Sequence, residues 1–278
     1  AGVTVAEAQG DLAIAEVAVL EAQIPIEMFG AEIAVIEAEV NAHAAWMVTD
    51  RLRVGKTPTF FVTTPANLHL AGEDNSRSYF AFMDRLQEHT TLQSGTLPQD
   101  QRLNQPDEPL EIGAIVSLEA ARLFEVGVGD RLLAVPPWVD AVPYVSVVIT
   151  GVFQKNDSAD DFWYLEQSVL DAATGPSFRT IPFYLSERAF MDVLGPQMRK
   201  MEGTYAWRLP VDIGRVNARN AQFTRGHLAT MHRNLTATLS SFRQSTAIEG
   251  ALREYDRRIF FSKFPMFVVL ILIDVVIL

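Results

Sequence analysis

Apolar runs separated by glycine and proline breaks dominate the middle of this chain. Residues 145–153 form a run long enough for a strand, and residues 131–135 form a shorter one after the break at Gly127-Val128-Gly129-Asp130. Before that break, residues 118–124 have the spacing of a short helix, and Ser117 stands where a helix cap is expected. The pattern therefore predicts a helix, a glycine turn, a strand, a loop and a second strand in succession.

The same mixture of elements continues on both sides of this stretch. Further strands are predicted at 51–64 (one or two strands), 110–116, 178–185 and 204–209. Short helices are predicted at 78–89 and 186–194, with a helical turn at 165–171 and a loop at 94–109. Pro182 indicates an edge position for its strand, because proline cannot donate to a sheet. Strands and short helices in alternation predict an α+β fold class, a mixed α/β domain.

Helical patterns flank this mixed region. Residues 4–23 are rich in Ala, Glu and Val and begin with Thr4 and Glu7 in a capping-box arrangement, and residues 31–46 show a second helical period with an acidic side. We therefore expect an N-terminal helical segment over residues 1–48, with a solvated acidic face.

A longer amphipathic pattern begins near residue 216 and extends to Ile259, with Gly250 as a weak point. Apolar residues recur at intervals of three and four, namely Leu228, Met231, Leu235, Leu239 and Phe242. This periodicity fits a helix packed on its own core and a stalk equally well. Beyond it, residues 265–278 are apolar apart from Asp274, which indicates the start of a transmembrane helix.

Composition narrows the classes of function. The chain has 278 residues, a formal net charge of −11 and 49% hydrophobic residues, enough for one or two domains with a sizeable core. This charge argues against a nucleic-acid partner, because binding phosphates requires a basic patch. The chain has no cysteine, which excludes a disulfide framework, cysteine metal sites and cysteine nucleophiles, and fits an extracytoplasmic domain.

Motifs for catalysis or cofactor binding give little signal. The chain contains no G-x-S-x-G elbow and no Walker A loop, and His227 and His232 lack the spacing of a helical zinc pair. Asp157, Asp160 and Asp161, with Glu166 beyond, are the best candidates for a cation site. We favour the alternative, a solvated turn whose aspartates bond their own backbone, and we expect no catalytic residue, no cofactor and no metal.

Several short motifs resemble the extracytoplasmic core domain of MacB-like and FtsX-like ABC transporter permeases. In that family a "vGD" element precedes an "ItGif" element and a "d..d.yW" element. The matching residues here, over a likeness spanning residues 49–278, are Gly127, Gly129, Asp130, Gly151, Phe153, Asp157, Asp161 and Trp163. Residues 86–98, which include His89, are similar to an upstream "l..Hv.l..Gr.P" segment, and residues 205–212 resemble a late strand of the family.

The resemblance implies a division of the chain and a role. It implies an extracytoplasmic domain over 49–214, stalk helices over 215–261 and the start of a transmembrane helix over 262–278, in a cell membrane. The implied partners are a cytoplasmic ABC ATPase, a second permease copy and the lipid bilayer, and the implied role is mechanical coupling of ATP hydrolysis to substrate export or extraction. Two other classes stay open, a membrane-anchored sensor or adhesion domain without an ATPase, and a secreted enzyme.

Overall fold

The computed structural model describes residues 16–25, 29–73, 75–137, 144–163, 178–198, 201–217, 219–239 and 241–246, with 248, 250, 252 and 257. Its strands are β1 (Glu16–Pro25), β2 (Leu52–Lys56), β3 (Phe60–Thr63), β4 (Ser76–Met83), β5 (Thr90–Gly95), β6 (Glu111–Ser117), β7 (Arg131–Val135), β8 (Val145–Lys155), β9 (Arg179–Tyr184), β10 (Glu202–Val211) and β11 (Arg243–Ser245).

The helices are fewer and mostly short. The α-helices are α1 (Phe29–His43), α2 (Leu118–Phe124) and α4 (Ala221–Thr238). The shorter turns are η2 (Pro65–Leu70), η3 (Leu86–Glu88), η4 (Asp161–Trp163), the π-helical η5 (Ala189–Leu194), η6 (Gly195–Gln197) and η7 (Ile213–Arg215). Within the described residues, no helix combines the length and the apolar character needed to cross a membrane.

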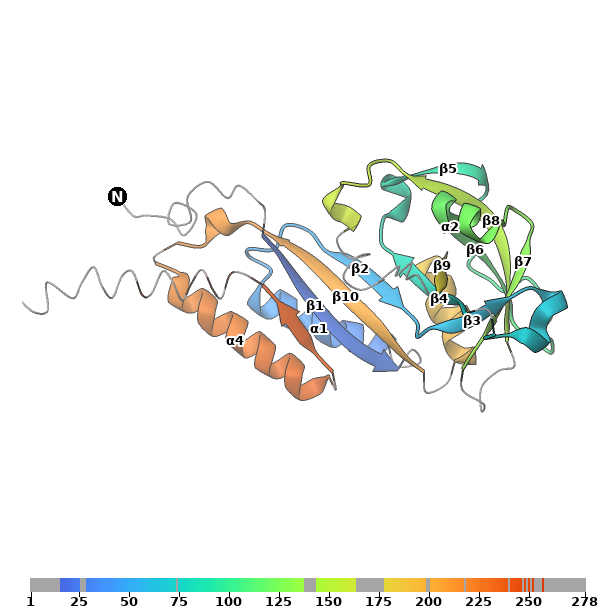
Figure 1. The fold of residues 1–278 in the computed structure, drawn as a ribbon. Coiled ribbons are helices and arrows are strands. Elements are labelled where there is room, and N and C mark those ends of the chain that lie inside the picture. Colours follow the sequence, from blue (N-terminus) through green and yellow to red (C-terminus); the bar gives the residue numbers. More distant parts are fainter. Residues whose placement is uncertain are drawn as a thin grey trace, which may run out of the picture.

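All the strands belong to one hydrogen-bonded sheet that has two parts (Figure 1). At one end, β11, β1, β10 and β2 lie side by side as an open sheet. At the other end, β4, β3, β7, β8, β6 and β9 follow one another, and β9 pairs again with β4, so these six strands close into a barrel. Strand β5 pairs with β8 outside this ring, and the β2–β4 pairing joins the open sheet to the barrel.

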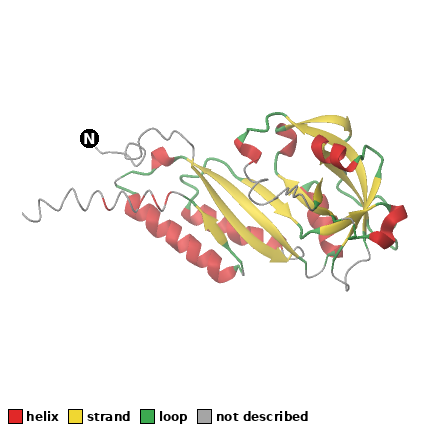
Figure 2. Cartoon of the chain, in the orientation of Figure 1, coloured by secondary structure: helices red, strands yellow, loops and turns green. Residues whose placement is uncertain are grey.

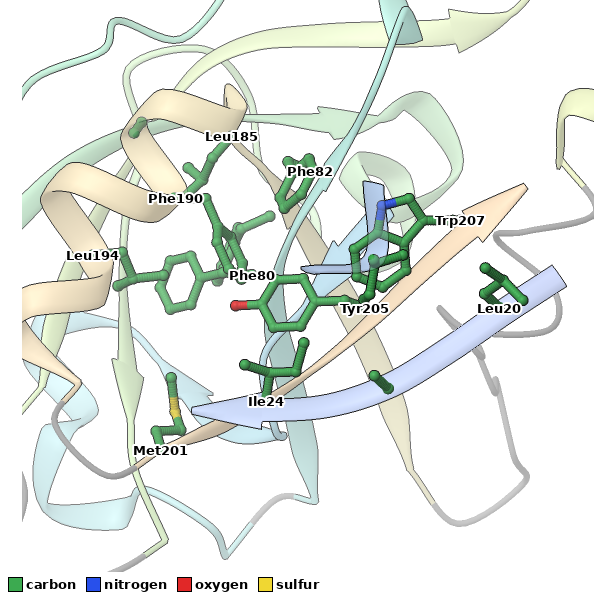
Figure 3. Close-up of a cluster of buried hydrophobic side chains, with 14 of the residues drawn as sticks. Leu20, Ile24, Phe80, Phe82, Leu185, Phe190, Leu194, Met201, Tyr205 and Trp207 are labelled. Carbon is green, nitrogen blue, oxygen red and sulfur yellow. The ribbon is translucent and has the colours of Figure 1, made fainter. Parts of the chain in front are cut away.

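Helices α1 and α4 pack against each other and cover one face of the open sheet (Figure 2). Their buried residues, such as Val40 and Leu235, belong to the same core as the barrel interior. Phe82 of β4 links the two regions, because its ring centroid lies 5.2 Å from that of Phe190 and 6.5 Å from that of Tyr205 on β10 (Figure 3).

Much of the predicted mixed region is confirmed. The structure is an α+β domain, and strands occur at both sites within 51–64 and at 111–117, 131–135, 145–155 and 202–211. The Ser117 side chain caps α2 by accepting a hydrogen bond from the Ala120 N–H at 3.2 Å. The Ser186 hydroxyl likewise accepts from the Ala189 N–H at 3.0 Å, which begins the helix predicted at 186–194.

The N-terminal helical prediction is wrong for part of its range. The helix at 31–46 exists as α1, but residues 16–25 form strand β1, so the segment 1–48 is not helical throughout. Leu20, Ala22 and Ile24 are fully buried, whereas Gln23 is exposed, which is the alternation of a strand with one covered face. Pairing with β10 and β11 overrides the helical propensity of Ala and Glu.

Two predictions in the centre of the chain are also corrected. Residues 76–83 form strand β4 and not a helix, because both faces of this central strand are covered and its apolar residues form a continuous run. Strand β9 is not an edge strand, since it pairs with both β4 and β6. Leu185 donates its N–H to Ala81, and strand alternation turns the nitrogen of Pro182 away from β4, so the proline removes no hydrogen bond from that pairing.

Helix α4 is shorter than the helix that the sequence predicts. Helix α4 ends at Thr238, Leu239 is extended with φ −104° and ψ 131°, and the chain then returns to the open sheet as β11. The continuous helix expected from 216 to 259 is therefore wrong. Leu228, Met231 and Leu235 of α4 pack into the domain's own core, as one of the two interpretations of the periodicity predicts. The apolar segment 262–278 and the helical turn predicted at 165–171 lie outside the described residues.

Candidate functional site

The Gly127–Asp130 motif forms the turn that sets β7 beside β8. Gly129 has φ +93°, a conformation that favours glycine, and its N–H donates to the Ile149 carbonyl at 2.8 Å. The Asp130 carboxylate accepts the Gly127 N–H at 2.7 Å, and the Ile149 N–H donates to the Asp130 carbonyl at 2.9 Å. Of the two glycines of the turn, Gly129 has a positive φ and Gly127 does not.

Gly151 lies where three strands crowd together. The register of β6 against β8 skips Thr150 between Ala114 and Ile115, and the Thr150 hydroxyl donates to the Ala114 carbonyl at 3.2 Å. A Cβ at position 151 would lie 2.6 Å from the Thr96 carbonyl oxygen, which is too close for any side chain. The "TG" of this motif thus marks a β-bulge that lets β5 approach β8.

The acidic turn after β8 is held by its own backbone. The Asp157 carboxylate accepts the Ala159 N–H at 2.8 Å, and the Asp160 carboxylate accepts the Phe162 N–H at 2.9 Å. The preferred interpretation of these aspartates, that they bond their own backbone, is confirmed for both. Asp161 begins the 3-10 turn η4, and its side chain lies outside the described residues.

Phe162 and Trp163 fasten this turn to the rest of the domain. Both are buried, at 3% and 1% exposure, and the Trp163 indole N–H donates to the Asp157 carbonyl at 3.0 Å. They belong to a second hydrophobic cluster, here called the junction cluster, with Val19, Leu52, Val54, Tyr79, Ala81, Met83, Leu86, Ile115, Phe153, Tyr184 and Ala206. Its members come from the outer face of the barrel and from the face of the open sheet opposite the helices.

His89 completes the site and was not predicted as part of it. Its Nδ1 lies 2.7 Å from the Asp160 carboxylate, and its ring stacks on Phe162 with centroids 3.8 Å apart and planes at 4°. His89 belongs to the upstream segment that resembles the permease family, and Asp160 belongs to the acidic turn. The segments that contain His89 and Asp160 both resemble the same permease family, and this shared resemblance is the sequence signal that could have linked the two residues.

The charges around Asp160 favour its ionised form. The backbone N–H of Phe162 has the largest effect in holding the pKa of Asp160 below its usual value, and His89 and the Arg208 guanidinium lower it further, while burial acts in the opposite direction. On the outer side of the turn, the Lys155 ammonium lies 4.3 Å from the centroid of the Trp163 ring. The turn is therefore secured by the His89–Asp160 hydrogen bond, a stacked ring and a cation–π contact.

Two hollows flank this region, and each contains part of a sequence motif. One, of about 420 Å³, lies beside the glycine turn and is lined by Asp130, Arg131 and Arg179 among others. The other, of about 570 Å³, is lined by residues of β4, η3 and the start of the helix at 187–194, including Met83 and Glu187.

An ion-pair network forms one wall of the larger hollow. Arg53 of β2 contacts Asp84 at 3.1 Å and Glu187 at 3.0 Å. Burial disfavours the charge of Arg53, but Asp84 and Glu187 outweigh it and raise the pKa of Arg53. Burial also raises the pKa of Glu187 in spite of Arg53. The network connects β2 of the open sheet to Asp84, just after β4, and to Glu187, just after β9.

The described residues contain no group of three or more His, Asp or Glu side chains that could hold a metal ion. The residues of the short motifs lie in two turns, in a β-bulge and in the junction cluster. This arrangement gives the motif residues a structural role.

Comparisons with known proteins find a likeness among solved structures. No protein-family model and no curated protein matches the chain. Among solved structures, the chain is similar to a domain of a protein described as a permease from Porphyromonas gingivalis, with 12% sequence identity and a TM-score of 0.33, over 83% of this chain and 87% of that chain. At that TM-score, function has to be argued from the geometry of this chain.

Proposed function

We propose that this chain is the extracytoplasmic domain of an ABC transporter permease of the MacB-like or FtsX-like kind. In this proposal a separate cytoplasmic ATPase hydrolyses ATP, a second permease copy completes the transporter in the cell membrane, and this domain changes its hold on a substrate or partner. The proposal is supported by the order of the motifs and by the apolar segment at 265–278.

The observation that carries the proposal is the position of the two ends of the described domain. Strand β1, which begins it, pairs with β11, which lies near its end, so that Val19 faces Ser245 across the ladder. Helices α1 and α4, which adjoin these strands in sequence, also lie side by side (Figure 1). A domain inserted between two neighbouring membrane spans needs its ends close together, although many other domains share this property.

The short α4 changes how coupling has to work. Motion from a membrane segment would reach the domain through β11 and its pairing with β1, and not along one rigid helix. The same observation favours the alternative function, a membrane-anchored sensor or adhesion domain, because α4 is an ordinary packed helix. Locking β11 to β1 therefore distinguishes the two functions.

The test introduces a disulfide at this point in a chain that has no cysteine of its own. Glu21 of β1 and Arg243 of β11 are register partners, so Glu21→Cys with Arg243→Cys can form a cross-strand bridge. The full membrane protein, reconstituted with its ATPase, is assayed for ATP hydrolysis before and after oxidation. We expect oxidation to lower ATP turnover and reduction to restore it.

A matched bridge inside the barrel provides the control. Arg131 of β7 and Val148 of β8 are also register partners, and Arg131→Cys with Val148→Cys should leave turnover unchanged after oxidation. If no ATPase associates with the protein, or if the locked β1–β11 variant hydrolyses ATP normally, the permease proposal fails and the anchored-sensor function takes its place.

A further inference from the structure

Two histidines meet where α1 packs against α4. The Nδ1 atoms of His43 and His227 lie 3.1 Å apart, with ring centroids separated by 5.1 Å. His43 is the last residue of α1 and His227 lies in the second turn of α4, so the contact joins segments 184 residues apart. No spacing in the sequence links these two histidines.

The Glu39 carboxylate lies beside the second ring nitrogen of His43, Nε2. Glu39, one helical turn earlier, places its Oε2 atom 3.4 Å from His43 Nε2, and the Asn234 amide donates to that same oxygen at 3.0 Å. A carboxylate near Nε2 favours the tautomer in which Nε2 carries the proton. The Nδ1 atom of His43 then presents a lone pair toward His227.

A carboxylate beside the second ring nitrogen is one feature of histidines that bind metal ions. Metal-binding histidines usually donate their second nitrogen to a carboxylate, which fixes the tautomer and the ring orientation. With Zn–N bonds of about 2.0–2.1 Å, two nitrogens of a tetrahedral site are separated by about 3.3 Å. The observed 3.1 Å between the Nδ1 atoms is close to this separation.

We propose that His43 and His227 bind one divalent transition-metal ion that clamps α1 to α4. Imidazole ligands suit Zn²⁺, Cu²⁺ and Ni²⁺, whereas Mg²⁺ and Ca²⁺ prefer oxygen. The described residues offer no third His, Asp or Glu for the ion, so water fills its remaining positions. On binding, the proton on His227 Nδ1 moves to Nε2 through solvent, and both Nδ1 lone pairs then face the ion.

The competing explanation is a hydrogen bond between two neutral imidazoles, which needs no ion. The proposal also stands apart from the proposed permease function, because either can fail alone. The probe is Zn²⁺, titrated into the full chain by calorimetry, with Co²⁺ absorption to report nitrogen coordination. We expect one ion per chain, a thermal midpoint that rises with Zn²⁺, and no response to Mg²⁺.

Three variants and a control make the test specific. His43→Gln and His227→Gln should each abolish Zn²⁺ binding and the midpoint rise, and Glu39→Gln should weaken binding about 10–100-fold. His232→Gln, an exposed histidine on the same helix, should bind as the wild type does.

The midpoint of each variant without metal shows whether it has folded, and Glu39→Gln keeps both ligands if a histidine variant does not fold. Absence of Zn²⁺ binding, or binding that persists in His43→Gln and His227→Gln, overturns the proposal. Binding lost in His232→Gln overturns it as well, because the ion would then lie elsewhere.

Discussion

Trp163 is expected to hold the barrel and the open sheet together, and Trp163→Ala tests this directly. The side chain is 1% exposed, lies in the junction cluster and makes an edge-to-face contact with Phe162 at 5.0 Å between centroids. Its indole N–H donates to Asp157, and Lys155 lies over its outer face. Substitution by alanine removes all these contacts and leaves a cavity between the two parts of the sheet.

The expected loss of unfolding free energy follows from the surface that Trp163 buries. A buried tryptophan removes about 150–250 Å² from water. At about 25 cal/mol per Å², this burial stabilises the fold by roughly 4–6 kcal/mol, of which alanine retains a minor part. Measured costs of Trp→Ala in protein cores are about 3–5 kcal/mol, and we expect a loss in this range. Domains of this kind have a total stability of about 5–15 kcal/mol, so the loss is a large fraction.

Urea unfolding followed by circular dichroism provides the assay. Because the indole bridges two parts of the domain, we expect Trp163→Ala to lower the midpoint and to separate the unfolding of the open sheet from that of the barrel. Phe223→Ala is the matched control, since this aromatic side chain is 54% exposed and should cost less than about 0.5 kcal/mol. A loss below about 1 kcal/mol for Trp163→Ala would refute the role of the junction cluster.

Three further predictions concern the turns and α4. Gly129→Val should destabilise the domain by about 1–3 kcal/mol because φ is +93° there, whereas Gly226→Ala on the exposed face of α4, where an added Cβ meets nothing within 4 Å, should be neutral or stabilising in thermal melts. The lowered pKa of Asp160 means that its carboxylate stabilises the fold above about pH 4, the range of an ordinary aspartate, and that this stability is lost as the pH falls through the folded-state pKa. The difference in unfolding free energy between wild type and Asp160→Asn, measured by urea titration, should therefore shrink in acid. A difference that does not depend on pH would contradict the stabilising role of the carboxylate. Leu235→Ala should cost about 2–5 kcal/mol because Leu235 is fully buried, and Thr236→Ala on the exposed side should cost little; equal effects on chemical denaturation would mean that α4 does not pack as described.

Local chemistry explains which elements could be predicted from the sequence. The Ser117 cap, the positive φ at Gly129 and the apolar run of β8 depend on residues within a few positions of one another. Such signals survive in any tertiary context that does not oppose them. The order of elements from residue 111 to residue 155 was therefore predictable.

The errors at β1 and β4 share one physical cause, which is pairing between distant segments. Strand β1 has a composition that favours helix, and its partners β10 and β11 lie far along the chain. Strand β4 is buried on both faces, so it lacks the alternation by which an exposed strand is recognised. In both cases the backbone hydrogen bonds to distant strands determine the structure, and the local sequence does not show which strands will pair.

The contact between His89 and Asp160 shows how two weak motifs acquire meaning in the fold. The two residues are 71 positions apart, and each motif alone is short enough to occur by chance. In the structure, one motif supplies the imidazole and the other supplies the carboxylate and the ring on which the imidazole stacks. The two segments therefore depend on each other physically, and both serve the junction between the barrel and the open sheet. The stacked ring of Phe162 and the buried Trp163 beside it attach this contact to the junction cluster, so the two short segments are part of what locks the barrel and the open sheet together.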